Sequence, residues 1–148
     1  MRGGVGEKIK KREARVLIVD DFETVISRVR GELESCGIAA ENISAVQIKS
    51  HADVAKIFTE IEKQNPDLIL IDQEMILFGE NREFIEQIFG TKIIPAIARK
   101  SPNSAIVSHT GELAQFLIKL KSAGADAAIK KFQIRSLFAD SNLLQSSS

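Results

Sequence analysis

The stretch Pro66-Asp67-Leu68-Ile69-Leu70-Ile71-Asp72-Gln73-Glu74-Met75 carries the clearest structural signal in the chain. Four large aliphatic residues follow one another and end abruptly at a carboxylate, a pattern that suits a strand covered on both faces. Pro66 favours a new element starting here. Asp72 then stands at the carboxyl end of a buried strand, where open parallel sheets place their binding sites. An Asp in this position is also a common turn residue, so its meaning depends on what other segments bring to the same edge.

Composition narrows the class of protein. The chain has 148 residues, enough for one domain with a substantial core, and its 20 Lys and Arg balance its 20 Asp and Glu. This balance gives no electrostatic indication of nucleic-acid binding, and no apolar run is long enough for membrane insertion. A single Cys, Cys36, excludes an internal disulfide framework, and no signal peptide is visible. We therefore expect a cytoplasmic protein.

Further apolar runs alternate with helical patterns on both sides of the central stretch. The predicted strands cover 16–19, 43–48, 68–71, 105–107 and 127–129. The predicted helices begin near Phe22, after Ser50, near Phe84, after Thr110 and near Ile134, with Gly37 ending the first. The stretch 92–100 is ambiguous, because Pro95 argues against a long regular helix.

This alternation predicts an α/β fold in one domain. Strands separated by single helices form a parallel sheet with right-handed crossovers and helices on both faces. We expect a doubly wound five-stranded sheet of flavodoxin-like order 2-1-3-4-5. The domain is predicted over residues 16–144, with a basic flexible tail over 1–15 and a frayed end over 145–148.

In that strand order, polar side chains from four strands meet at one edge. Asp20 and Asp21 end the first strand beside Asp72, and Ser108 ends the fourth; Lys130 or Lys131 ends the fifth. Three clustered carboxylates repel one another, and Mg²⁺, a hard cation that prefers oxygen ligands, resolves the conflict. A positioned carboxylate surrounded by cations is suited to accepting a phosphoryl group.

With these motifs in this order, the chain resembles the receiver domains of two-component response regulators. The resemblance covers Val16 to about Leu144 and rests on Asp20-Asp21, Asp72, Ser108 and Gly124-Ala125-Asp126 leading to Lys131. It implies that Asp72 is the phosphoacceptor, that Ser108 hydrogen-bonds the phosphoryl group, and that Lys131 pairs with Asp72 or its phosphate. The implied metal ligands are Asp20, Asp21, Asp72 and the backbone carbonyl of Glu74.

Several positions depart from the family pattern. Ile76, a few residues after Asp72, and Phe132, directly after Lys131, stand where the family usually has proline. The change at Phe132 leaves Lys130 as a second candidate for the site lysine. Ala128 holds the place of the aromatic residue that swings inward on activation. His109 follows Ser108 where a small residue is common, either shielding an acyl phosphate from water or lying in a solvated loop.

The sequence leaves three functions open. The first is a single-domain response regulator, not an enzyme. It takes a phosphoryl group from a sensor histidine kinase or phosphotransfer protein and signals to a downstream protein. The second is a pseudo-receiver that acts as a scaffold without phosphorylation. The third is a Mg²⁺-dependent phosphatase of the haloacid-dehalogenase type, which needs a second Asp where this chain has Phe22.

Overall fold

A five-stranded parallel sheet forms the centre of the molecule. The computed structural model describes residues 13–111 and 119–140. Its sheet strands run in the order β2-β1-β3-β6-β7. Their bounds are β1 (Val16–Asp20), β2 (Ile43–Gln47), β3 (Leu68–Asp72), β6 (Ala105–Thr110) and β7 (Ala127–Lys130). Counting sheet strands alone, this is the predicted order 2-1-3-4-5, so the predicted fold class is confirmed.

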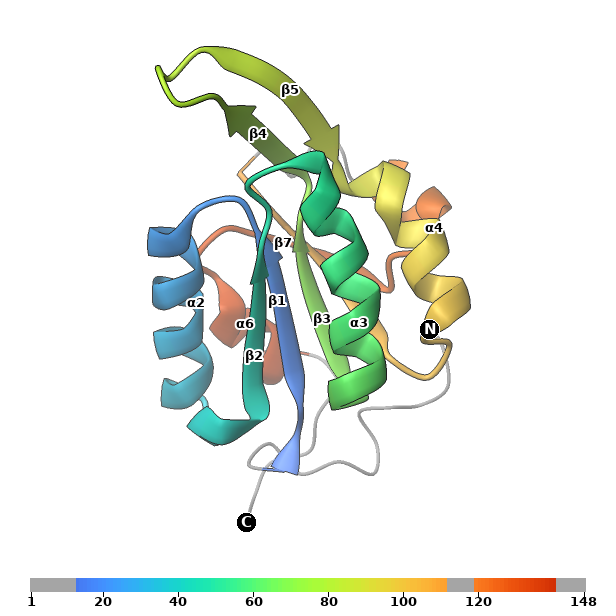
Figure 1. The fold of residues 1–148 in the computed structure, drawn as a ribbon. Coiled ribbons are helices and arrows are strands. Elements are labelled where there is room, and N and C mark those ends of the chain that lie inside the picture. Colours follow the sequence, from blue (N-terminus) through green and yellow to red (C-terminus); the bar gives the residue numbers. More distant parts are fainter. Residues whose placement is uncertain (1–12, 112–118, 141–148) are drawn as a thin grey trace.

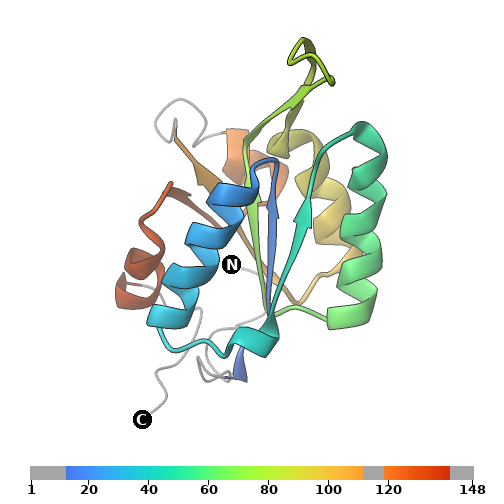
Figure 2. The same ribbon diagram turned by 60° about the vertical axis from the view of Figure 1, so that its left-hand side comes forward.

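Helices cover both faces of the sheet, as predicted. Figures 1 and 2 place α2 (Glu23–Ser35) and α6 (Ile134–Asp140) on one face, and α3 (Val54–Gln64) and α4 (Gly90–Lys100) on the other. The strands alternate between the two layers: Val16 and Ile18 pack toward α2, whereas Leu17 and Val19 pack toward α3. The described helices are all too short and too polar to cross a membrane.

Local signals in the sequence account for several helix boundaries. Ser50 and Asp53 form a reciprocal capping box at η3 (His51–Asp53), which leads into α3. Gly37, with a φ of 100°, follows the end of α2 and leads to the short helix η2 (Ala40–Asn42). These boundaries agree with the predicted ones.

Some sequence-based expectations fall on parts that the structure does not describe. The predicted fifth helix is described from residue 119, where residues 119–123 are helical and Leu120 is buried. Its other predicted core residues, Leu113, Phe116 and Leu117, lie outside the described residues, as do positions 1–12 and 141–148. Ala14, inside the predicted N-terminal tail, is fully buried.

The predicted loop over 73–81 and the predicted helix near Phe84 are wrong. The chain instead forms an antiparallel hairpin of β4 (Glu74–Phe78) and β5 (Phe84–Phe89). Figure 1 shows this hairpin beyond the carboxyl edge of the main sheet. Phe84, Ile85, Ile88 and Phe89 have helix-like spacing, but β-branched and aromatic residues also favour strands, and β4 supplies a pairing partner.

The hairpin has a buried base and an exposed tip. Met75 and Leu77 from β4 and Ile88 from β5 pack into the core layer beneath α3 and α4. Phe84 and Ile85, predicted as buried, are instead 63% and 58% exposed, and Phe78 is 50% exposed. The two ends of the hairpin meet where the Gly90 N–H donates to the Gln73 carbonyl at 2.7 Å.

Gly90 begins a helix instead of ending one. A Cβ at this position would lie 2.8 Å from the Asp72 carbonyl oxygen and 3.2 Å from Gln73 Cα. Glycine therefore allows α4 to start directly against the end of β3. Pro95 lies inside α4, so the ambiguous stretch 92–100 is helical despite the missing proline N–H.

Candidate functional site

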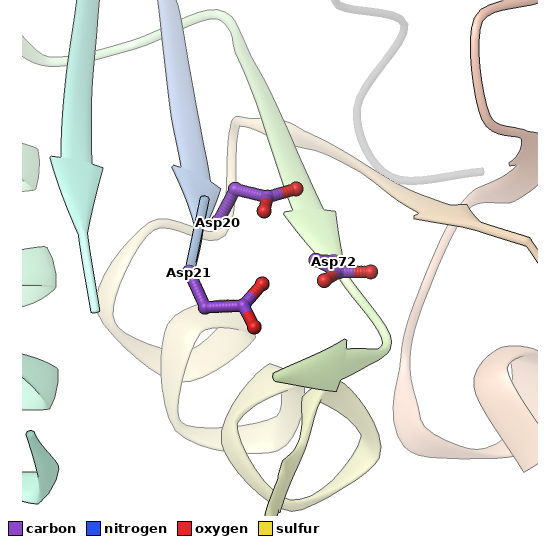
Figure 3. Close-up of side chains that lie close together, drawn as sticks. All are labelled: Asp20, Asp21 and Asp72. Atoms are coloured by element: carbon purple, nitrogen blue, oxygen red, sulfur yellow. The ribbon is translucent and has the colours of Figure 1, made fainter. Parts of the chain in front are cut away.

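Three aspartates gather at the carboxyl edge of the sheet. Asp20 ends β1, Asp21 follows it, and Asp72 ends β3, the neighbouring strand. Figure 3 shows the Asp20 and Asp21 side chains extending from β1 toward Asp72. One carboxylate oxygen from each residue lies within 4.8 Å of the others. Strand pairing alone brings these groups together, because β1 and β3 are hydrogen-bonded neighbours.

The cluster is buried, and burial raises the pKa values of two of its carboxyl groups. Burial, and after it the neighbouring Asp20 charge, raises the pKa of Asp72 to about 9 against the opposing charge of Lys131. Burial likewise raises the pKa of Asp20 to about 7, against the hydrogen bond donated by the Phe22 N–H. Without a compensating cation, this site therefore resists carrying three negative charges.

A lysine directly after the last strand supplies part of the compensating charge. Lys131 Nζ lies 3.5 Å from Asp72 Oδ1. The Lys131 N–H donates to the Thr110 carbonyl at 2.9 Å, which ties the residue to the end of β6. Lys130, the second candidate, is exposed at the end of β7. The structure thus brings Lys131 to the acidic cluster.

The fourth sheet strand presents a different hydroxyl from the one predicted. Ser108 pairs in register with Ile71, one residue below Asp72, and faces the α3 and α4 side of the sheet. It is fully buried, its Oγ has no hydrogen-bond partner, and it does not line the pocket beside Asp72. Thr110, which does line that pocket, was expected only to cap the next helix, because the strand was predicted to end at Val107.

A pocket of about 240 Å³ opens beside the acidic cluster. Its lining includes Asp21, Asp72, Lys131 and Thr110 together with Phe22, Glu74, Ile76 and Gly111. Glu74 and Ile76 belong to β4, so the hairpin forms one wall. Sequence reasoning missed this wall because it assigned residues 73–81 to a loop.

His109 does not lie in a solvated loop. It is 2% exposed and stands in β6 opposite Asp72. Its Nε2 accepts a hydrogen bond from the Phe132 N–H at 3.1 Å. Burial, together with the nearby Lys131 charge, lowers the pKa of His109 to about 4. The imidazole is therefore neutral near pH 7.

The donor set fits a hard divalent cation. Asp21 Oδ1 and Asp72 Oδ2 are buried and have no hydrogen-bond partner. Oxygen atoms of this kind are what Mg²⁺ prefers, and a cation would remove the mutual repulsion that raises the carboxyl pKa values. Asp20, Asp21 and Asp72 are the residues that would hold it.

Comparison with known proteins identifies the fold. No protein-family model matches the chain, and no curated protein matches it in sequence. Among solved structures, a LuxR-family two-component response regulator from Aurantimonas matches with a TM-score of 0.63 and 18% identity, over 86% of each chain. A CheY-like response regulator receiver domain protein from Methanospirillum hungatei matches with a TM-score of 0.59 and 24% identity, over 89% of this chain and 90% of that one.

A third similar structure carries a different description. A pilus assembly-related protein from Burkholderia pseudomallei matches with a TM-score of 0.64 and 12% identity, over 95% of this chain and 96% of that one. The chain therefore has the fold of response regulator receiver domains. Within this fold, the acidic cluster lies at the carboxyl ends of β1 and β3, and the Lys131 side chain extends to it from the turn after β7.

Proposed function

We propose that this chain is a response regulator that accepts a phosphoryl group on Asp72 and signals by binding another protein. One observation carries the proposal: Asp20, Asp21 and Asp72 converge within 4.8 Å, with Lys131 Nζ 3.5 Å from Asp72 Oδ1. A carboxylate held between a cation site and an ammonium group is the arrangement that phosphoryl transfer to a side chain requires.

The proposed chemistry is a single displacement. A carboxylate oxygen of Asp72 attacks the phosphorus of a phosphohistidine on a histidine kinase or phosphotransfer protein. A P–O bond forms and the P–N bond breaks, leaving its electron pair on the imidazole nitrogen. The product is an acyl phosphate on Asp72. The protein is a switch rather than an enzyme, because the phosphoryl group stays on its own side chain.

The surrounding residues have separate tasks in this scheme. Asp20, Asp21, Asp72 and, by family resemblance, the Glu74 carbonyl would hold Mg²⁺. The bound ion would neutralise charge on the transferred phosphoryl oxygens. Lys131 would hold another phosphoryl oxygen, and Thr110, which lines the pocket, would take the task predicted for Ser108, which does not line it. The Phe22 and Ile76 side chains would limit access of water.

The test is intact-mass spectrometry after incubation with acetyl phosphate and Mg²⁺. We expect a gain of one phosphoryl group that requires Mg²⁺, is released by hydroxylamine and is lost in Asp72→Asn. Glu80→Gln, which removes a negative charge at the exposed hairpin tip, is the matched control and should label normally. Absence of labelling in the folded wild-type protein, with a known receiver labelled in parallel, would contradict the proposal.

A scaffold function is the second candidate, and Ala128 favours it. This residue packs beside the core and replaces the aromatic side chain through which receivers of this family relay phosphorylation. In that case a partner binds equally well to the wild-type protein and to Asp72→Asn. Phosphorylation-dependent binding would instead support the response regulator and would require a different relay.

A further inference from the structure

The turn that carries Lys131 has an unusual backbone conformation. Gln133 N–H donates to the Lys130 carbonyl at 3.2 Å, so Lys131 and Phe132 are the central residues of the turn. Phe132 has a φ of 65°. This left-handed conformation is normally taken by Gly or Asn in such a turn and is unfavourable for a bulky residue. Other contacts must therefore stabilise Phe132.

Two side chains from other elements hold Phe132 in place. His109 Nε2 accepts from the Phe132 N–H at 3.1 Å, and the two rings meet edge to face with centroids 6.0 Å apart. On another side, the Arg28 guanidinium carbon lies 3.7 Å from the centre of the Phe132 ring. His109 of β6 thus contacts both the backbone and the ring of Phe132, and Arg28 of α2 contacts the ring from another side.

The imidazole of His109 is suited to this task. A neutral ring with its proton on Nδ1 leaves Nε2 free to accept a hydrogen bond. Because His109 stands opposite Asp72 on β3 and opposite Ile129 on β7, it connects the strand of the acceptor to the turn of the lysine. Loss of the Nε2 acceptor would leave the Phe132 N–H unpaired at a partly buried site.

We propose that His109 is a positioning residue that holds the Lys131-Phe132 turn in the left-handed conformation and thereby keeps the Lys131 ammonium beside Asp72. The effect of His109 on phosphoryl transfer rests on the proposed function. The effect of His109 on the distance between the Lys131 and Asp72 side chains does not, and it can be tested without any phosphate.

The first measurement addresses the hydrogen bond itself. In ¹⁵N-labelled wild-type protein at pH 7, long-range ¹H–¹⁵N correlation spectra distinguish the two tautomers of each histidine. We expect His109 as the Nδ1–H tautomer, with unprotonated Nε2. A proton on Nε2 at this pH would overturn the proposal, because that nitrogen would then be unable to accept from Phe132.

The second measurement addresses the lysine. After reductive ¹³C-methylation, the Lys131 signal is identified by its loss in Lys131→Arg. Its response to Asp72→Asn then reports the contact between the two side chains. We expect this response in the wild-type protein and in His109→Gln, which retains an acceptor of similar reach, but not in His109→Leu. An unchanged response in His109→Leu would overturn the proposal.

The third measurement follows acetyl phosphate labelling of Asp72 in the same variants. We expect His109→Leu to lower the labelling rate about 10- to 100-fold, with Mg²⁺ binding unchanged and with the rate recovered in His109→Gln. His51→Leu, at an exposed histidine, is the matched control. If the wild-type protein is not labelled while the lysine signal responds as expected, the response regulator proposal fails and the positioning role stands.

A second background tests the role of His109 if His109→Leu folds poorly in the wild-type protein. Phe132→Gly keeps the N–H but removes the steric cost of the positive φ, so the turn needs less help from His109. In the Phe132→Gly background, His109→Leu should then change the lysine signal much less than in the wild-type background. Equal effects in the two backgrounds would contradict the proposed role of His109.

Discussion

The Asp21 carboxylate accepts a hydrogen bond from the Ile76 N–H at 2.9 Å, and this bond connects the acidic cluster to the β4–β5 hairpin. The acceptor is Oδ2, while Oδ1 of the same carboxylate is buried and has no partner. One oxygen therefore stabilises the hairpin and the other is available to a cation. Asp21 has a structural role that its place in the metal-ligand set did not indicate.

Removal of that carboxylate should loosen the hairpin base. In Asp21→Ala we expect hydrogen exchange at the Ile76 amide to become at least about tenfold faster, because its acceptor is lost. Asp20→Ala is the control, since Asp20 Oδ1 accepts from the Phe22 N–H and not from the hairpin. Equal exchange at Ile76 in both variants, measured by NMR without metal, would show that the bond contributes nothing to the hairpin.

The raised carboxyl pKa values predict an unusual dependence of stability on pH. The folded protein holds protons on Asp20 and Asp72 up to about pH 7 and 9, whereas the unfolded chain releases them near pH 4. Between these limits the folded state binds more protons, so these two groups lower the free energy of unfolding as the pH rises.

Asp72→Asn isolates this effect. Without divalent metal, the variant should exceed the wild-type protein in free energy of unfolding by about 1 to 3 kcal/mol at pH 9, with the difference disappearing toward pH 4. Urea titrations across this range would check it. Parallel curves for the two proteins would contradict the raised pKa of Asp72. Mg²⁺ should stabilise the wild-type protein more at pH 8 than at pH 6, because it competes with protons.

The charge of Lys131 should lower the pKa of Asp72. Its ammonium group opposes the rise in the Asp72 pKa, so Lys131→Met should raise that pKa further. Lys130→Met removes the same charge at the exposed neighbouring position and should have little effect. Carboxyl ¹³C shifts of Asp72, followed through a metal-free pH titration, would reveal the change. A larger effect from Lys130→Met would identify Lys130 as the site lysine.

Two glycines should respond in opposite directions to alanine. Gly90→Ala places a methyl group 2.8 Å from the Asp72 carbonyl oxygen, and we expect a loss of about 1 to 3 kcal/mol. Gly31 lies in the middle of α2, and no neighbouring group comes within 4 Å of the place that a Cβ would take. Gly31→Ala should therefore stabilise by about 0.5 to 1 kcal/mol. Chemical denaturation measures both. A stabilised Gly90→Ala protein would contradict the close packing at the end of β3.

The main sheet was predictable because its strands are continuous apolar runs. Leu68 to Ile71 and Val16 to Val19 have no polar interruption, and each ends at an Asp, so strand order alone placed Asp20 beside Asp72. Contacts of this kind follow from topology and need no knowledge of side-chain packing.

The hairpin was not predictable by the same reasoning. Met75, Ile76 and Leu77 continue the apolar character of β3 after the Asp72-Gln73-Glu74 interruption, and the Phe84 to Phe89 segment is compatible with either a helix or a strand. Pairing between these two neighbouring segments decided the outcome, and periodicity within one segment does not report it. The proposed role of His109 was not predictable for a related reason. The strand was expected to end at Val107, but β6 continues to Thr110, so His109 lies in the strand and is buried.

The hydrogen bond between Gly90 and Gln73 means that the hairpin leaves and rejoins the chain at nearly the same point. An insertion with adjoining ends adds length without displacing the elements on either side, so β3 and α4 keep the spacing they would have across a short connection. The exposed tip, residues 79–83, could therefore be exchanged for another turn, whereas the base of the hairpin has to stay because it packs into the core and bonds to Asp21. In this protein, the tip of the hairpin can therefore vary in sequence and length without moving the acidic cluster.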